Sequence, residues 1–139
     1  MNKIILDASA LLRFVDNDAG ADRIEALLDQ ARTGKVEIVI SAVNWGEIVH
    51  SLLRARGGEQ VNELLPKLRA LPIKISVVTQ DSAEDAAKFK YSHKLAYADA
   101  FAGSLALSQS ATLVTAAQDF RPIPASALKV DFLPNKSKS

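Results

Sequence analysis

Short hydrophobic runs recur along the chain and are separated by longer segments in which hydrophobic and polar residues mix. The runs are rich in β-branched residues and have no polar face, which predicts strands buried on both sides of a sheet. Four such runs span residues 3–6, 36–40, 73–78 and 112–115, and residues 128–132 predict a short edge strand.

The segments between these runs place hydrophobic residues three and four positions apart, which is the spacing of helices with one buried face. Gly34 ends the second segment, Gly57 and Gly58 end the third, and Pro66 is expected to distort the fourth. The predicted helices span residues 8–15, 21–32, 42–56, 59–71, 81–94 and 97–110. Strands that alternate with helices predict an α/β fold, a three-layer sandwich in which a parallel four- to five-stranded sheet is flanked by helices.

Length and composition are those of one globular domain. The chain has 139 residues, of which 48% are hydrophobic and 24% charged, which is enough apolar material for a core. We expect residues 1–133 to form the domain and residues 134–139 to be a disordered polar tail. The net charge of +1 gives no global basic field, so any contact with nucleic acid needs a local patch. The absence of cysteine excludes disulfides and thiolate metal sites.

No targeting or membrane-spanning segment is expected. The first hydrophobic run is short and is interrupted by an acid, unlike a signal peptide. No stretch approaches the roughly 20 apolar residues that a spanning helix needs. We therefore expect a cytoplasmic protein without membrane contact.

Two aspartates follow predicted strands. Asp7 comes directly after residues 3–6, and Asp119 follows residues 112–115 after the short loop Ala-Ala-Gln. In open parallel sheets, ligands bind beyond the carboxyl ends of the strands, so both aspartates belong at the edge where a site would form. For Asp119, an ordinary turn aspartate is the alternative interpretation.

Two further acids lie within predicted helices. Asp99 is the one residue expected to be charged in the apolar segment 96–107. A buried carboxylate is costly unless it is paired or binds a metal, although the helix dipole also favours an acid in the first turn. Glu47 points away from the apolar stripe of its helix. It is therefore either an exposed glutamate or part of the wall of a cleft.

Carboxylates that meet in one pocket repel one another unless a cation intervenes. Hard cations such as Mg²⁺ and Mn²⁺ prefer oxygen ligands, and with only His50 and His93 available an imidazole-rich site is disfavoured. A carboxylate cluster with such a cation suits phosphoryl chemistry, because the metal can activate water and stabilise the transition state.

Four segments, in this order, resemble those of the PIN-domain ribonucleases, and more narrowly those of VapC-type toxins from toxin–antitoxin pairs. They are IILDASALL around Asp7, ISAVNWGEIVHSLLR around Glu47, LAYADAFAGSLAL around Asp99 and TLVTAAQDF around Asp119. The resemblance extends from residue 3 to about residue 132.

This resemblance implies a PIN-like parallel sheet flanked by helices and an RNA-cleaving site that depends on Mg²⁺ or Mn²⁺. It also implies a homodimer and a cognate antitoxin protein that wraps and neutralises the toxin. Asp7, Glu47 and Asp99 match three family carboxylates by position. With Asp119 as the fourth, these residues are the predicted catalytic and metal-binding set.

Three other residues are predicted to support the site. Ser9 resembles a hydroxyl position that often lies near it, with a helix cap as the alternative. Thr115 either orients a ligand or merely ends a strand. Arg54 is a candidate for a contact with RNA phosphate. Other candidate cations are Arg13, Arg56, Lys88, Lys90 and Lys94.

The chain departs from the family pattern after the last core strand. The family commonly reads Thr-Gly-Asp-x-Asp-Phe, whereas here Ala117 occupies the first acidic position and only Asp119 remains. Either Asp119 serves as the fourth carboxylate, or a second metal position is weak. The pattern therefore leaves the choice between one and two metals open.

Three functions compete on these observations. The leading hypothesis is a Mg²⁺- or Mn²⁺-dependent endoribonuclease that acts as the toxin of a type II toxin–antitoxin system. The alternative, motivated by Ala117, is a catalytically impaired PIN-fold module that binds RNA or protein. A third, an aspartyl-nucleophile phosphohydrolase using Asp7, is disfavoured because such enzymes usually need a second aspartate where this chain has Ser9.

Overall fold

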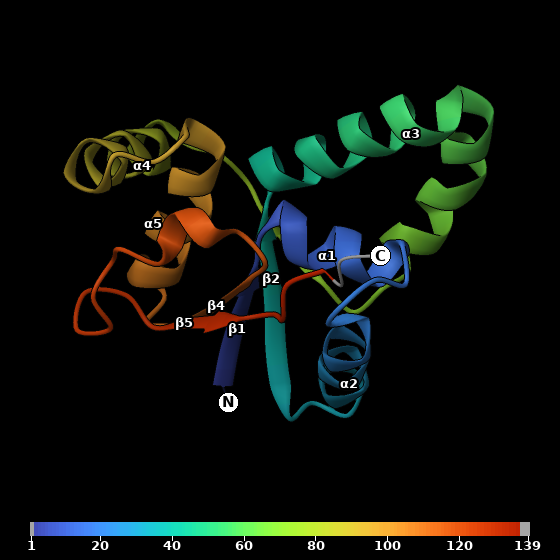
Figure 1. The fold of residues 1–139 in the computed structure, drawn as a ribbon, viewed down its shortest axis with the longest axis horizontal. Helices are drawn as coiled ribbons and strands as arrows, with labels where there is room; N and C mark the ends of the chain where they lie inside the picture. The colour runs from blue at the N-terminus through green and yellow to red at the C-terminus, as the bar shows by residue number, and fades with distance from the viewer. Residues whose placement is uncertain (1, 137–139) are drawn as a thin grey trace.

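The computed structural model describes residues 2–136 and has a five-stranded sheet at its centre (Figure 1). All neighbouring strands are parallel, in the order β3-β2-β1-β4-β5. The predicted parallel α/β sandwich is therefore confirmed, including the short edge strand. The strands are β1 (Asn2–Leu6), β2 (Val36–Ser41), β3 (Lys74–Ser76), β4 (Thr112–Thr115) and β5 (Val130–Phe132).

Helices cover both faces of the sheet, which gives the three layers. One core packs α1 (Ala8–Val15), α2 (Ala21–Arg32) and α3 (Ala42–Arg69) on one face. The other core packs α4 (Gln80–His93) and α5 (Tyr97–Ser108) on the opposite face, together with a short 3₁₀ turn, η1 (Gln118–Phe120).

Side chains of the central strands alternate between the two cores. In β1, Leu6 packs with α1 and α3, whereas its neighbour Ile5 packs with α5. Val114 and Leu113 of β4 divide in the same way. These strands are hydrophobic on both faces because both faces are covered, as their unbroken apolar runs predict.

Element α3 contains the two helices that were predicted. It runs from Ala42 to Arg69, and Gly57 within it has the non-helical backbone angles φ 80° and ψ 167°. The break predicted at the glycines is therefore confirmed as a kink at which the two helices meet. Pro66 remains within the helix without non-helical backbone angles, so the distortion expected there is wrong.

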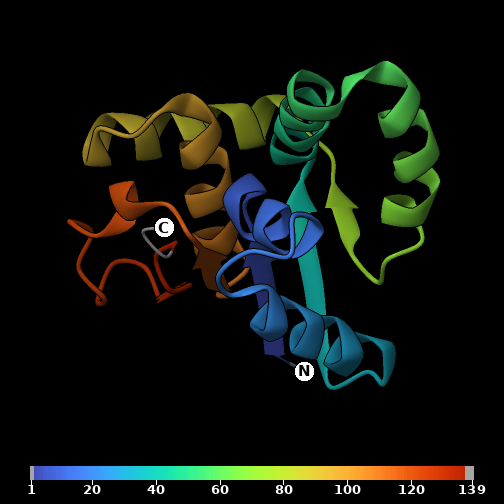
Figure 2. The same ribbon diagram turned by 45° about the vertical axis from the view of Figure 1, so that its right-hand side comes forward.

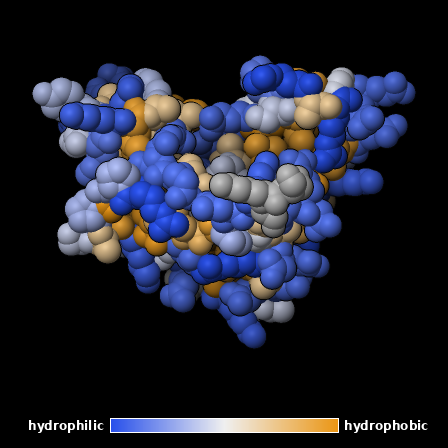
Figure 3. Space-filling view, viewed as in Figure 1, coloured by the Kyte–Doolittle hydropathy of each residue, from blue (hydrophilic) through white to orange (hydrophobic). Residues whose placement is uncertain are grey.

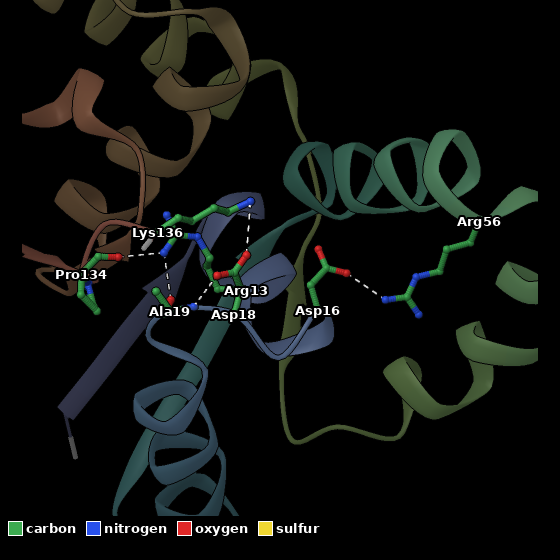
Figure 4. Close-up of polar contacts among 7 residues, drawn as sticks. All are labelled: Arg13, Asp16, Asp18, Ala19, Arg56, Pro134 and Lys136. Carbon is green, nitrogen blue, oxygen red and sulfur yellow. Dashed lines mark hydrogen bonds and ion pairs between the residues drawn. The ribbon is translucent and has the colours of Figure 1, made fainter. Parts of the chain in front are cut away.

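Polar contacts fix the first residues beyond β5 (Figure 4). Arg13 of α1 donates to the backbone oxygens of Ala19 (2.9 Å) and Pro134 (2.8 Å). Lys136 pairs with Asp18 at 3.4 Å. The start of the predicted tail thus contacts the α1–α2 connection, and residues 137–139 lie outside the described residues.

None of the helices among residues 2–136 is both long enough and apolar enough to cross a bilayer.

Candidate active site

The carboxylate of Asp7 is buried at the end of β1, where it caps α1. Its side chain is 2% exposed, and Oδ1 accepts hydrogen bonds from the backbone N–H of Ala10 (3.0 Å) and the hydroxyl of Ser9 (2.7 Å). The hydroxyl of Thr115 donates to Oδ2. Burial raises the pKa of Asp7 above its ordinary value, although the hydrogen bonds from Thr115, Ser9 and Ala10 oppose that rise.

Ser9 and Thr115 join the start of α1 to the loop after β4. The backbone N–H of Ala116 donates to Ser9 Oγ, and that of Ala117 donates to Thr115 Oγ1, both at 2.9 Å. The two hydroxyl oxygens lie 3.2 Å apart. The helix cap of α1 is Asp7, so the interpretation of Ser9 as that cap is wrong. Both hydroxyls instead orient the carboxylate and the loop that leads to Asp119.

Asp99 lies in the first turn of α5 and is partly buried. Its pKa is raised to about 6, first by burial and then by the negative charges of Asp7, Asp119 and Glu47. The charges that act on Asp99 therefore come from three distant parts of the chain.

Glu47 is partly buried in the second turn of α3, six residues after the N-cap Ser41. Its Oε1 accepts a hydrogen bond from the side-chain amide of Asn44 at 2.9 Å. The charge of Glu47 raises the pKa of both Asp7 and Asp99. The alternative of an isolated, fully exposed glutamate is therefore wrong.

Asp119 is exposed in η1, the one of the four acids that solvent reaches freely. Figure 2 shows the first turns of α1, α3 and α5 at the same end of the sheet, near the carboxyl ends of the strands. Helix α3 packs against both α1 and α5. The fold thus brings all four predicted acids to one edge of the sheet.

The four acids form an electrostatic group rather than a preformed cage. Within residues 2–136, no three histidine, aspartate or glutamate side chains lie close enough together to form a complete metal cluster. Mg²⁺ is usually bound through one or two carboxylates and retains several waters, so a complete cluster is not required. Asp99 and Asp119, whose charges act on one another, offer two oxygen-donor groups at an accessible edge. Mutual repulsion among the acids further favours a cation there.

Among the predicted cations, Arg54 stands out. It is exposed on α3, seven residues after Glu47, and therefore lies on the same side of the helix two turns further along. Arg13 and Arg56 instead make structural contacts, the latter with Asp16 at 2.8 Å (Figure 4). Lys90 donates to the backbone oxygen of Leu95 at 2.8 Å.

Sequence reasoning missed Asn44, which is fully buried beside Glu47. An asparagine three residues before a glutamate in the first turn of a helix was an available signal. It has no specificity by itself, because a polar first-turn residue is usually solvated or part of a cap.

Known proteins resemble this chain in two ways: one family matches it in sequence, and solved structures match it in fold. The family model for the PIN domain matches residues 4–125. No curated protein sequence matches the chain.

The solved structures that resemble this chain include toxin–antitoxin proteins. The structure of VapBC2 from Rickettsia felis, bound to a DNA fragment from its promoter, aligns with a TM-score of 0.72 and 16% identity, over 95% of this chain and 99% of that one. DNA-bound VapBC from Salmonella typhimurium aligns with a TM-score of 0.72 and 13% identity, over 95% and 98%. VapC20 from Mycobacterium tuberculosis, described as a toxin that cleaves the sarcin–ricin loop, aligns with a TM-score of 0.67 and 19% identity, over 86% and 93%. At these identities, the likeness is one of fold.

Proposed function

The chain belongs to the PIN domain family, and from this premise we propose that it is a Mg²⁺- or Mn²⁺-dependent endoribonuclease. The observation that carries the proposal is the placement of four acids, from the end of β1 and from α3, α5 and η1, at the carboxyl edge of the sheet, where the charges of the other three act on Asp99. Structural proteins rarely gather acids in this way without a compensating cation.

Each residue has a role in this proposal. Asp99 and Asp119 would hold the ion, and Asp7 and Glu47 would add the negative potential that attracts it. Ser9 and Thr115 orient Asp7 and the loop before Asp119. Arg54 contacts a phosphate of the bound RNA. The divalent ion, when bound, supplies a Lewis acid that activates water for attack on the phosphodiester.

Cleavage of a mixed RNA substrate with Mn²⁺ tests the proposal. Asp99→Asn should lower the cleavage rate by about 100-fold or more, because it removes a charge at the ion. Asp22→Asn is the matched control, since Asp22 occupies the first turn of α2 but lies outside the site. Equal rates for the wild type and Asp99→Asn would refute the catalytic role.

A catalytically impaired module that binds RNA or protein is the second candidate. Two observations favour it: Ala117 replaces a family acid, and residues 2–136 contain no complete metal cluster. Calorimetric titration with Mn²⁺ separates the two candidates. Absence of binding at millimolar Mn²⁺ would favour the module, whereas saturable binding supports the nuclease.

The toxin role requires an antitoxin protein, and an apolar surface of α1 and α3 suits one. Phe14, Val15 and Leu65 are only partly buried there, and Leu53 is 42% exposed. Figure 3 shows apolar surface on the α3 side of the molecule, next to a notch that separates it from the α4–α5 side. The Rickettsia felis and Salmonella typhimurium structures are themselves VapBC proteins, which supports the same kind of assembly here.

Co-expression with the product of a small neighbouring reading frame tests this partner. A stable complex is expected, and Leu53→Glu should weaken it at least about tenfold by placing a charge in the apolar contact. Val77→Glu is the control, because Val77 is a still more exposed apolar residue (72%) that follows the edge strand β3 on the opposite face. If no neighbouring frame yields a complex, the toxin role fails while the nuclease role stands.

A homodimer completes the proposal. Exposed apolar side chains gather beside β3 and α5: Val77 and Val78 border a hollow that Phe101 also lines, Tyr97 stacks on Phe101, and Leu107 is 55% exposed. Several exposed apolar side chains on one side of a molecule are typical of an interface between subunits. We assign it to a second copy of the chain, which acts with its antitoxin in the cytoplasm.

A further inference from the structure

Asn44 lies between the two helices that carry Glu47 and Asp99. Its side chain is fully buried in the first turn of α3. The amide Nδ2 donates one hydrogen bond to Glu47 Oε1 (2.9 Å) and another to the backbone oxygen of Ala98 (3.1 Å). Because Ala98 directly precedes Asp99, one amide group connects the carboxylate on α3 to the backbone that carries the carboxylate on α5.

The side-chain N–H groups of Asn44, and not its amide oxygen, make the contacts with Glu47 and Ala98. Both partners of Nδ2 are acceptors, so a reversed amide would bring Oδ1 against a carboxylate and a carbonyl oxygen. In the observed orientation, Oδ1 is buried without a hydrogen-bond partner among residues 2–136. A buried acceptor without a partner destabilises the fold, and an apolar side chain would avoid that loss. The benefit of asparagine here therefore lies in its two donated hydrogen bonds.

We propose that Asn44 is a positioning residue that fixes Glu47 relative to Asp99 and thereby sets the affinity of the site for its divalent ion. The inference rests on the proposed function, since it requires the acids to bind Mg²⁺ or Mn²⁺. A free glutamate side chain samples many rotamers, so its charge is only part of the time near the ion, whereas the hydrogen bond from Asn44 holds the Glu47 charge in one place without a further loss of freedom on binding. Groups that orient metal-facing side chains in this way typically change metal affinity by about 10- to 100-fold.

Calorimetric titration with Mn²⁺ tests the proposal on the whole chain. Asn44→Ala should raise the Kd for Mn²⁺ about tenfold or more. Asn62→Ala is the matched control, because Asn62 is an exposed asparagine of the same helix, and its Kd should equal that of the wild type. In a Glu47→Gln background, Asn44→Ala should change the Kd less than about twofold, because the residue acts through the Glu47 carboxylate.

The outcomes separate this inference from the proposed function. If the wild type does not bind Mn²⁺, the proposed function fails. If the wild type binds and Asn44→Ala binds equally well, or if its effect is unchanged in the Glu47→Gln background, the positioning role is overturned.

A second measurement covers the case in which Asn44→Ala does not fold. In the wild type, the side-chain amide signals of Asn44 in nuclear magnetic resonance spectra should shift when Mg²⁺ is added. In Glu47→Gln, the chemical shifts of the Asn44 side-chain amide should change, because its N–H no longer donates to a charged carboxylate. Signals that respond neither to Mg²⁺ nor to Glu47→Gln would overturn the inference.

Discussion

At the scale of single residues, the site is defined by acids in environments that differ in solvation. Asp7 is buried and accepts three hydrogen bonds, which fix its carboxylate in one orientation. Asp99 is partly buried, and no group among the described residues 2–136 donates a hydrogen bond to its carboxylate, so the neighbouring charges act on it with less compensation. The exposed Asp119 completes the group. Asp7 therefore both caps α1 and contributes a carboxylate to the site. Asp99 is the acid whose pKa depends on burial and on the charges of the other three.

The raised pKa of Asp99 predicts how stability depends on pH without divalent ions. The folded protein holds this proton up to a pKa of about 6, whereas the unfolded chain releases it near 3.8. The folded state thus binds more protons between these values, so the free energy of unfolding decreases as pH rises from about 4 to about 6 and stays lower above that range. The raised pKa of Asp7 acts in the same direction.

Asp99→Asn should remove much of this dependence. In a chelating buffer at pH 7.5, we expect the variant to be more stable than the wild type by on the order of 1 kcal/mol, allowing for the partial exposure of Asp99. The gain should shrink as pH falls and be almost lost near about pH 3, below both pKa values, where Asp99 is mostly protonated in the folded and the unfolded wild type. Urea unfolding at several pH values measures it, and a gain independent of pH would contradict the electrostatic origin.

At the scale of elements, the kink at Gly57 changes the direction of the second half of α3 (Figure 1). Gly57 has a positive φ with an extended ψ, a combination that is essentially restricted to glycine. Arg56, directly before the kink, pairs with Asp16 at the end of α1 (Figure 4). The kink therefore lies next to the ion pair that links α3 to α1, at the border of the proposed antitoxin surface.

Two neighbouring glycines make this conformation testable. No atom lies within 4 Å of a Cβ added at either Gly57 or Gly58, so space does not distinguish them. Gly57→Ala should lower the free energy of unfolding by about 1–3 kcal/mol because its backbone angles are strained for alanine. Gly58→Ala should raise it by about 0.5–1 kcal/mol, because alanine favours the helix. Guanidinium unfolding of Gly57→Ala and Gly58→Ala measures both changes. Equal effects of the same sign would contradict the non-helical conformation of Gly57.

At the scale of the whole molecule, the two faces of the sheet present different surfaces. The α1–α3 side carries the proposed antitoxin contact, and the β3–α5 side carries the exposed apolar residues assigned to a second copy. The carboxylate edge lies beyond the strand ends, where elements of both sides meet. A dimer formed through the β3–α5 side would leave the antitoxin surface of each subunit free.

Val77→Glu should convert the dimer to a monomer. Val77 is 72% exposed, so a charge there should not affect folding, but it would be unfavourable in an apolar interface. Sedimentation equilibrium of the wild type, Val77→Glu and Leu53→Glu measures the effect. Leu53→Glu should remain dimeric, and a monomeric wild type would exclude the assigned interface.

Most of the fold could be predicted from the sequence, because burial on both faces of a parallel strand leaves an unbroken apolar run. The bounds of α1 and α2 match the prediction to the residue. The bounds of β3 do not, since its predicted run of six residues pairs only over Lys74–Ser76. An edge strand lacks a second neighbour, and hydrogen bonding to β2 alone decides where it ends.

The sequence by itself determined the architecture and the four acids, because periodicity and strand-end position are local properties of a chain. Only the tertiary structure decided how these acids interact. The coupling of Glu47 to Asp99 depends on α3 packing against α5, and the donors to Asp7 come from Ser9 and from Thr115, 108 positions away. Contacts between residues so far apart depend on how the elements pack, and no local pattern in the sequence specifies that packing.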